Sequence, residues 1–279
     1  MLIMQKYQGL GNDYLILNPK ENALKLEEKQ ISFLCRRNFG VGADGILYGP
    51  IENGEKNYIR IFNSDGSEAS HSGNGVMIFA KYLKDFGYCK EDRVSLYTKS
   101  GKITVEFLGE NAEKLRVCMG KPLFACEKIP VLAEEEEIIN EPLLFHGNLY
   151  NATCVSVGNP NCVIMMEEVC GKKAKELGPY VENASYFPNQ TNLQLCHVED
   201  RHHIKLETYE RGSGYTLSSG TGACAAAASA YRLGVAGNEI TVQMPGGKLF
   251  VEIKEDFTMY MTGAAKAVGT FFVAEHFFA

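Results

Sequence analysis

The chain has 279 residues, of which 45% are hydrophobic and 22% charged, and its formal net charge is −6. This composition is typical of a folded globular protein, and the negative balance argues against a nucleic-acid partner. The length suggests about two domains of roughly 150 residues each. We find no apolar run long enough to span a membrane and no signal-peptide pattern at residues 1–6, so we expect a cytoplasmic protein.

The first half of the chain is expected to alternate short strands with helices. Strands are expected at 3–6, 14–17, 46–47, 58–62, 94–98 and 103–107, and helices at 26–36 and 75–83. Glycine-rich or polar turns separate them at 11–12, 39–45 and 63–68. The segment 108–145 joins the two halves, and its run of four glutamates at 134–137 is expected to lie on a solvated surface.

The second half repeats this order. Strands are expected at 153–157, 163–165, 204–209, 240–244 and 249–253, and helices at 168–181 and 223–233. The second of these helices is rich in alanine, whose small side chain allows a helix to sit tightly inside a surrounding sheet. Two further strands are expected at 259–261 and 265–272, where the chain returns to the first domain.

One motif occurs twice, as Ser72-Gly73-Asn74-Gly75 and as Ser219-Gly220-Thr221-Gly222. The same interval separates Gly11-Asn12 from Gly158-Asn159, and it places Asn63 opposite Glu210. Several matches at one spacing indicate two copies of one unit. We therefore predict an α+β protein of two pseudo-symmetric domains, each a mostly antiparallel sheet wrapped around a central helix. The first comprises residues 1–119 with 266–279, and the second residues 120–265.

The nine cysteines include no C-x-x-C pair and are odd in number. In a cytoplasmic protein such residues are usually reduced and buried as small apolar side chains. The ligand spacing of a zinc site is missing, and so is the lysine-containing loop that binds nucleotide phosphates. We therefore expect no metal site and no phosphate-bearing cofactor.

Each S-G-x-G turn by itself indicates only a capped helix, because serine is a common N-cap and glycine permits a tight turn. Two such turns in equivalent copies indicate more. Facing each other, they would bring two helix N-termini around one small anionic ligand, with amides at Gly73, Asn74, Gly220 and Thr221 holding a carboxylate. Polar residues at strand ends or turns would hold the remaining amino and carboxylate groups: Asn12, Asn63, Asn159, Asn192 and Arg211.

These residues lie in motifs that resemble the diaminopimelate epimerase family nearly from end to end. The matching segments are Gly-Leu-Gly-Asn-Asp-Tyr (9–14), Asn-Ser-Asp-Gly-Ser-Glu (63–68), Gly-Asn-Pro (158–160), Phe-Pro-Asn-Gln-Thr-Asn (187–192), Glu-Arg-Gly-Ser-Gly (210–214) and the two S-G-x-G turns. The resemblance implies a cofactor-independent epimerase that converts LL- to meso-diaminopimelate in lysine and cell-wall synthesis, usually as a homodimer. It also implies that the asparagines and Arg211 bind substrate and that Glu210 supports the acid–base pair.

The chain departs from the family where the chemistry takes place. The family has a cysteine before each G-x-G, whereas this chain has Ser72 and Ser219. A thiol suits proton transfer because its pKa is near 8.5 and falls at a helix N-terminus, whereas a serine hydroxyl is a far poorer base. We interpret the serines as substitutions that inactivate the enzyme, made deliberately to trap substrate or present in a naturally silent relative.

Three further departures concern the substrate. Asn161 stands where the family usually has a histidine beside the acid–base pair, Gln190 where a basic residue is common, and Tyr215 where a glutamate is common. They leave open a sister racemase that acts on another amino acid such as histidine.

Two other classes of function remain as alternatives. A non-catalytic amino-acid-binding module would use the same helix ends without chemistry. A serine hydrolase would need a base beside the hydroxyl, and the adjacent His71 is expected to point away from Ser72.

Overall fold

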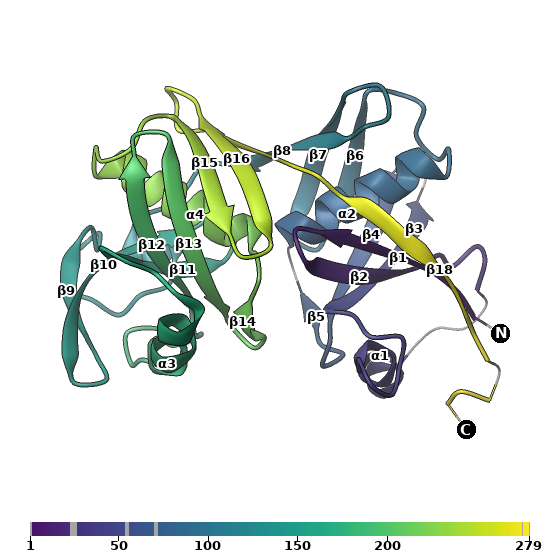
Figure 1. The fold of residues 1–279 in the computed structure, drawn as a ribbon, viewed down its shortest axis with the longest axis horizontal. Coiled ribbons are helices and arrows are strands. Elements are labelled where there is room, and N and C mark those ends of the chain that lie inside the picture. The colour runs from purple at the N-terminus through teal and green to yellow at the C-terminus, as the bar shows by residue number, and fades with distance from the viewer. Residues whose placement is uncertain (1, 23–26, 54–55, 70–71, 275, 279) are drawn as a thin grey trace. The chain divides into compact units, whose positions relative to one another are not determined.

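The computed structural model describes residues 2–22, 27–53, 56–69, 72–274 and 276–278. Two compact units make up the chain: unit 1 is Met1–Val117 with Gly263–Ala279, and unit 2 is Cys118–Thr262 (Figure 1). The domain boundaries expected from the sequence, at 119 and 265, lie close to these unit boundaries.

The described part of unit 1 contains helices α1 (Glu28–Cys35) and α2 (Gly73–Asp85). Its strands are β1 (Leu2–Gly9), β2 (Asn12–Leu17), β3 (Gly45–Asn53), β4 (Lys56–Asn63), β5 (Glu68–Ala69), β6 (Arg93–Thr98), β7 (Gly101–Leu108), β8 (Lys114–Gly120) and β18 (Lys266–Val273). β8 leads the chain out of unit 1, and β18 pairs antiparallel with β1 after the chain has returned.

Unit 2 contains helices α3 (Gly171–Glu182) and α4 (Gly220–Arg232), and a short 3-10 helix, Cys126–Lys128. Its strands are β9 (Glu141–Phe145), β10 (Asn148–Ser156), β11 (Pro160–Met165), β12 (Asn192–Asp200), β13 (His203–Glu210), β14 (Gly214–Thr216), β15 (Glu239–Met244), β16 (Gly247–Ile253) and β17 (Met259–Gly263).

The two units have the same strand order. In unit 1 neighbouring strands follow the order β18-β1-β2-β3-β4-β6-β7-β8, and in unit 2 the order β9-β10-β11-β12-β13-β15-β16-β17. Each sheet is antiparallel except at two equivalent places, β2–β3 and β4–β6 in unit 1, β11–β12 and β13–β15 in unit 2. The predicted pseudo-symmetric α+β architecture is therefore confirmed.

Each sheet surrounds a central helix. α2 contacts β18, β1 and β2 at one end of its strand order and β6 and β7 at the other, and α4 likewise contacts strands from β10 to β16. A sheet that touches one helix from both of its ends must curve around it (Figure 1). In α4 the residues from Ala223 to Ala228 are fully buried, as expected where only small side chains fit between strands.

The predicted helices lie where helical spacing placed them, with small shifts at their ends. The prediction at 26–36 corresponds to α1, although Leu26 lies outside the described residues. The helices expected at 75–83 and 223–233 begin earlier than predicted. α2 begins at Gly73, two residues earlier, and α4 begins at Gly220, three residues earlier. The glycines of each motif are therefore the first turn of the helix and not a loop before it.

Several strands carry no clear signal in the sequence. β8 and β9 lie within 108–145, the segment expected to be a connection, and β12 was not predicted. β12 is buried over Asn192–Cys196 and lies between β11 and β13, so both of its faces and both of its edges are covered. A strand covered on both faces is expected to be a nearly continuous apolar run, and the polar Asn192 and Gln194 interrupt that run here.

We expect Gly178→Ala to destabilise unit 2. Gly178 lies in α3 against the ring of Tyr209, where an added Cβ would be 2.2 Å from Cγ of that ring. Overpacking of this kind typically costs about 1–3 kcal/mol, which exceeds the gain of up to about 1 kcal/mol from the better helix former. Urea unfolding measures the effect, with the exposed Glu176→Ala on the same helix as control. A Gly178→Ala protein as stable as the parent would show that Tyr209 has room to move.

Candidate active site

Both serines of the repeated motif are N-caps. Ser72 Oγ accepts a hydrogen bond from Gly75 N at 3.0 Å, and Ser219 Oγ accepts one from Gly222 N at 3.2 Å. Both residues have the extended backbone conformation typical of an N-cap. Each unit therefore presents a hydroxyl at the positive end of its central helix, beside the amides of the first turn.

In unit 1 the candidate substrate residue Asn12 is held by a charged cluster at the start of β2. Asn12 Nδ2 donates to Asp44 Oδ2 at 2.9 Å, which fixes the orientation of the side-chain amide. Arg37 bridges the two carboxylates, donating to Asp13 Oδ1 at 2.7 Å and to Asp44 Oδ1 at 2.6 Å. Lys6 Nζ lies 2.8 Å from Asp13 Oδ2. Burial by itself would raise the pKa of Asp13, but hydrogen bonds from Arg37 and Lys6 hold that pKa below its usual value.

The other candidate of unit 1, Asn63, lies at the end of β4 in a tight turn. Its Nδ2 donates to Ser67 Oγ at 3.0 Å, and its backbone N donates to Ser67 O at 2.9 Å. Ser67 is held in turn by Asp65 Oδ1. The side-chain bond of Asn63 therefore runs to its own turn, whereas that of its repeat partner Glu210 runs to the cap serine of unit 2.

In unit 2 Glu210 lies directly beside the N-cap hydroxyl. Ser219 Oγ donates to Glu210 Oε2 at 2.8 Å, and Thr216 Oγ1 donates to Glu210 Oε1 at 2.7 Å. Thr221 Oγ1 lies 3.4 Å from Ser219 Oγ. Since an ionised carboxylate only accepts hydrogen bonds, the proton of Ser219 points at Glu210.

A buried chain of amides positions the Gly-Asn-Pro turn of unit 2. Thr208 Oγ1 donates to Gln194 Oε1 at 2.7 Å, and Gln194 Nε2 donates to Asn161 Oδ1 at 3.2 Å. Asn161 Nδ2 donates to Asn159 Oδ1 at 3.1 Å, and Asn159 Nδ2 donates to Thr221 Oγ1 at 3.2 Å. Asn161 is fully buried, so its side chain orients Asn159. No sequence motif pointed to Gln194, whose place in this chain depends entirely on strand pairing.

The last two candidates are linked through the backbone. Asn192 Nδ2 donates to Pro160 O at 2.7 Å, and its Oδ1 accepts from Arg211 N at 2.9 Å. The guanidinium of the exposed Arg211 donates to Asn189 O at 2.7 Å. Asn192 therefore ties the Arg211 turn to the Gly-Asn-Pro turn, and both lie in unit 2 with Glu210.

Two of the departures from the family lie away from these side chains. Tyr215 donates to Glu207 Oε2 at 2.8 Å and packs against Gly171 and the side chain of Lys175 at α3. Gln190 donates to Asn183 Oδ1 at 2.8 Å and is exposed. Both act as packing or turn residues in unit 2.

The cysteine next to the second motif does not take the place of its missing thiol. All nine cysteines lie in the described part of the chain and are free. Cys224, the cysteine that follows the second motif, is fully buried in α4, and its burial raises the pKa of its thiol to about 12. A thiol with that pKa is protonated near neutral pH and is a poor nucleophile and base. The group at each cap position is therefore the serine hydroxyl.

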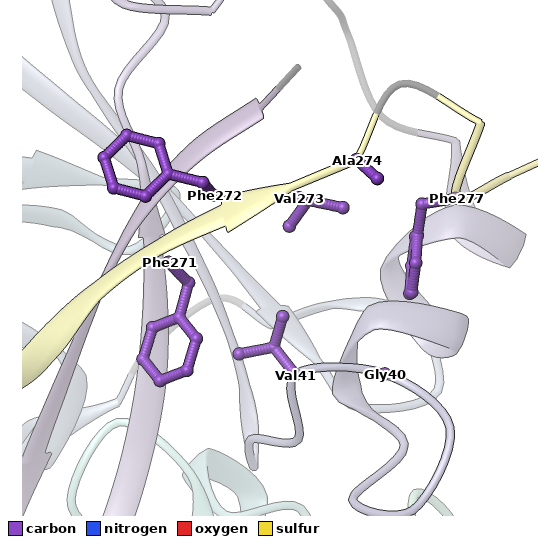
Figure 2. Close-up of a pocket in the computed structure, with 7 residues that line it drawn as sticks. All are labelled: Gly40, Val41, Phe271, Phe272, Val273, Ala274 and Phe277. Carbon is purple, nitrogen blue, oxygen red and sulfur yellow. The ribbon is translucent and has the colours of Figure 1, made fainter.

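An apolar pocket of about 330 Å³ lies elsewhere in unit 1 (Figure 2). It is lined by seven apolar residues, namely Gly40, Val41, Phe271, Phe272, Val273, Ala274 and Phe277. None of these side chains offers a hydrogen bond or a charge, so the pocket is unsuited to an amino acid's ionised groups.

Within the described residues, His, Cys, Asp and Glu form no group suited to a metal ion, and the helices include none that is apolar and long enough for a membrane span. A serine hydrolase would need a base, but His202 and His203 are exposed in unit 2: His203 contacts Asp200, and His202 lies 3.0 Å from Glu239 O. His71, which adjoins Ser72 in the sequence, lies outside the described residues.

Hydrogen bonds connect the unit 2 candidates near one helix N-terminus: Ser219 bonds to Glu210, Asn159 to Thr221, and Asn192 to the backbone of Arg211. In unit 1 Ser72 bonds to Gly75, whereas the side chain of Asn12 bonds to Asp44 and that of Asn63 to Ser67. That both helix ends act on one ligand stays a prediction, as do the roles of the individual residues.

The chain is similar to known proteins of one family. The family model described as diaminopimelate epimerase matches residues 4–125 and 153–268. Diaminopimelate epimerase 2 of Nostoc sp. (strain PCC 7120) is 42% identical over 258 residues, covering 92% of this chain and 90% of that protein. Diaminopimelate epimerase of Leptospira biflexa is 34% identical over 267 residues, covering 94% and 95%. A solved hydroxyproline epimerase from Agrobacterium vitis aligns over 97% of this chain and 91% of its own with a TM-score of 0.69, at 11% identity, which shows the fold alone.

The ion pairs of Asp13 are expected to make the free energy of unfolding depend on pH. The folded pKa of Asp13 lies below its unfolded value near 3.9, so its contribution is present above about pH 4 and is lost as the pH falls through the folded value. We expect Asp13→Asn to lower the free energy of unfolding at pH 7 and to lower it less at about pH 3, measured by urea unfolding. Asp92→Asn, which changes an exposed carboxylate, should stay within about 0.5 kcal/mol of the parent at both pH values. An equal loss for Asp13→Asn at both would contradict the assignment.

Proposed function

The chain belongs to the diaminopimelate epimerase family. We propose that it is an isomerase whose site suits the interconversion of LL- and meso-2,6-diaminopimelate without a cofactor. The observation that carries the proposal is the pair of capped helix N-termini, with Ser219 bonded to Glu210 at one of them. The retained Asn12, Asn159, Asn192 and Arg211 support it, because amides and a guanidinium suit a substrate with ammonium and carboxylate groups at both ends.

The proposed reaction moves one proton at the α-carbon. A base at one cap position takes the α-proton, and the electron pair of the broken C–H bond spreads into the adjacent carboxylate. An acid at the other cap position then delivers a proton to the opposite face, which inverts the centre. Amides at a helix N-terminus are already oriented toward the growing negative charge, so they stabilise it without reorganisation.

The serines make turnover slow. A thiol with a pKa near 8.5 exchanges a proton readily near neutral pH, and a hydroxyl does so only when a strong neighbouring base activates it. We propose that the chain as it stands binds the amino acid and scarcely turns it over, through deliberate substitution or in a naturally silent relative. A cytoplasmic homodimer that serves lysine and peptidoglycan synthesis completes the proposal.

Cysteine at both cap positions should give exchange of the α-proton. We expect Ser72→Cys/Ser219→Cys to exchange the α-proton of LL-diaminopimelate with deuterium from D₂O at least about 100-fold faster than the serine protein, the low end of general acid–base catalysis. Proton NMR of the substrate measures the rate, and each single cysteine variant is the control. A double variant that exchanges no proton of any amino acid would refute the epimerase and favour a binding module.

Binding by the serine protein should depend on Arg211. We expect meso-diaminopimelate to bind in a calorimetric titration, and Arg211→Ala to weaken binding at least about tenfold, since a hydrogen bond to a charged group contributes about 1.5–3 kcal/mol. Arg201→Ala, an exposed arginine of the same unit, is the matched control. Tighter binding of histidine than of diaminopimelate would favour the sister racemase.

A further inference from the structure

The hydroxyl of Ser72 has a partner that the sequence motifs do not indicate. Tyr14, in β2, places its phenolic oxygen 3.2 Å from Ser72 Oγ. Tyr14 is only 6% exposed, so its ring is fixed by the packing of unit 1. Ser72 Oγ also accepts the Gly75 N–H, so the cap oxygen lies between a backbone amide and a phenol.

Gly45 makes room for this phenol. Gly45 and Tyr14 are paired in the parallel register of β2 and β3. A Cβ on Gly45 would lie 2.7 Å from Tyr14 Cε1 and 2.2 Å from Phe62 O. The close approach of the Tyr14 ring and of the neighbouring strand β4 is therefore the reason that no side chain fits at position 45.

The two cap positions differ in electrostatics. Ser219 lies against the carboxylate of Glu210, which repels a negative charge on the cap atom. The position equivalent to Glu210 in unit 1 is Asn63, which bonds to Ser67 instead, and the partner of Ser72 comes from a different strand. A phenol carries its proton at neutral pH and can donate it to a charged neighbour.

We infer that Tyr14 is a positioning residue that donates a hydrogen bond to the group at position 72 and favours its deprotonated form, with Gly45 providing the space for its ring. Position 72 is then the side that begins the reaction as the base, and position 219, beside Glu210, is the side that begins protonated. This inference rests on the proposed function for its meaning in catalysis. The preference of the group at position 72 for its deprotonated form depends only on contacts within unit 1, because Tyr14 and Ser72 both lie there.

The test is the reactivity of a thiol placed at position 72. In Ser72→Cys, alkylation by iodoacetamide is followed over a range of pH, with peptide mass spectrometry to separate the introduced thiol from the nine native cysteines. Adding Tyr14→Phe keeps the ring and removes only the hydroxyl. We expect the pKa of the introduced thiol to rise by about one unit, which lowers its alkylation rate near neutral pH about tenfold.

Matched controls separate this effect from a general loss of packing. Tyr7→Phe removes another buried phenol of unit 1, one that donates to Asp85 Oδ2 at 2.9 Å, and should leave the thiol at position 72 unchanged. In Ser219→Cys, Glu210→Gln should lower the pKa of the thiol at position 219, the opposite direction. An alkylation profile at position 72 that Tyr14→Phe leaves unchanged would overturn the inference.

Activity gives a second, independent readout. In the double cysteine protein, Tyr14→Phe should move the acidic limb of the pH–rate profile for α-proton exchange to higher pH. Exchange that persists with an unshifted profile would refute the role of Tyr14 and leave the epimerase standing. Absence of any exchange, together with the expected alkylation shift, would refute the proposed function and leave the contact between Tyr14 and position 72 standing.

Discussion

Each unit buries one helix inside a curved sheet, and the positions of its polar side chains follow from that burial. A helix surrounded by strands has side chains packed around it, so only its ends can meet a ligand. From Ala223 to Ala230 most buried positions of α4 are alanine, whereas α2 buries large side chains such as Phe79 and Tyr82. The N-cap serine is then the side chain placed at the positive end of the helix dipole, and it becomes the natural position for a reacting group.

In unit 2 polar residues at strand ends lie near the start of the central helix. Asn192 begins β12 and Glu210 ends β13, and Glu210 bonds directly to the cap serine of α4. Their hydrogen bonds run mostly to one another or to the backbone, as in the chain from Thr208 through Gln194 to Asn161. Such preorganisation allows a fixed set of dipoles to act on charge that develops during a reaction.

The two units share their strand order but differ in the side chain that contacts the cap serine. Both units use the same strand order and the same serine cap, yet the group beside the cap is a phenol in unit 1 and a carboxylate in unit 2. A reaction that removes a proton on one side and delivers it on the other has use for two positions of different acidity. Two copies of one fold supply the shared strand order, and a few substitutions give each cap serine a different hydrogen-bond partner.

The repeat, the helices, most strands and the family can be predicted from the sequence, because these depend on local spacing and on short motifs. The sequence did not indicate β12, Gln194 or the partner of Ser72. Tyr14 and Ser72 are joined only because the parallel register of β2 and β3 sets Tyr14 over Gly45, a pairing of residues far apart along the chain. Contacts of that kind follow from strand register and close packing, which only the tertiary structure decides.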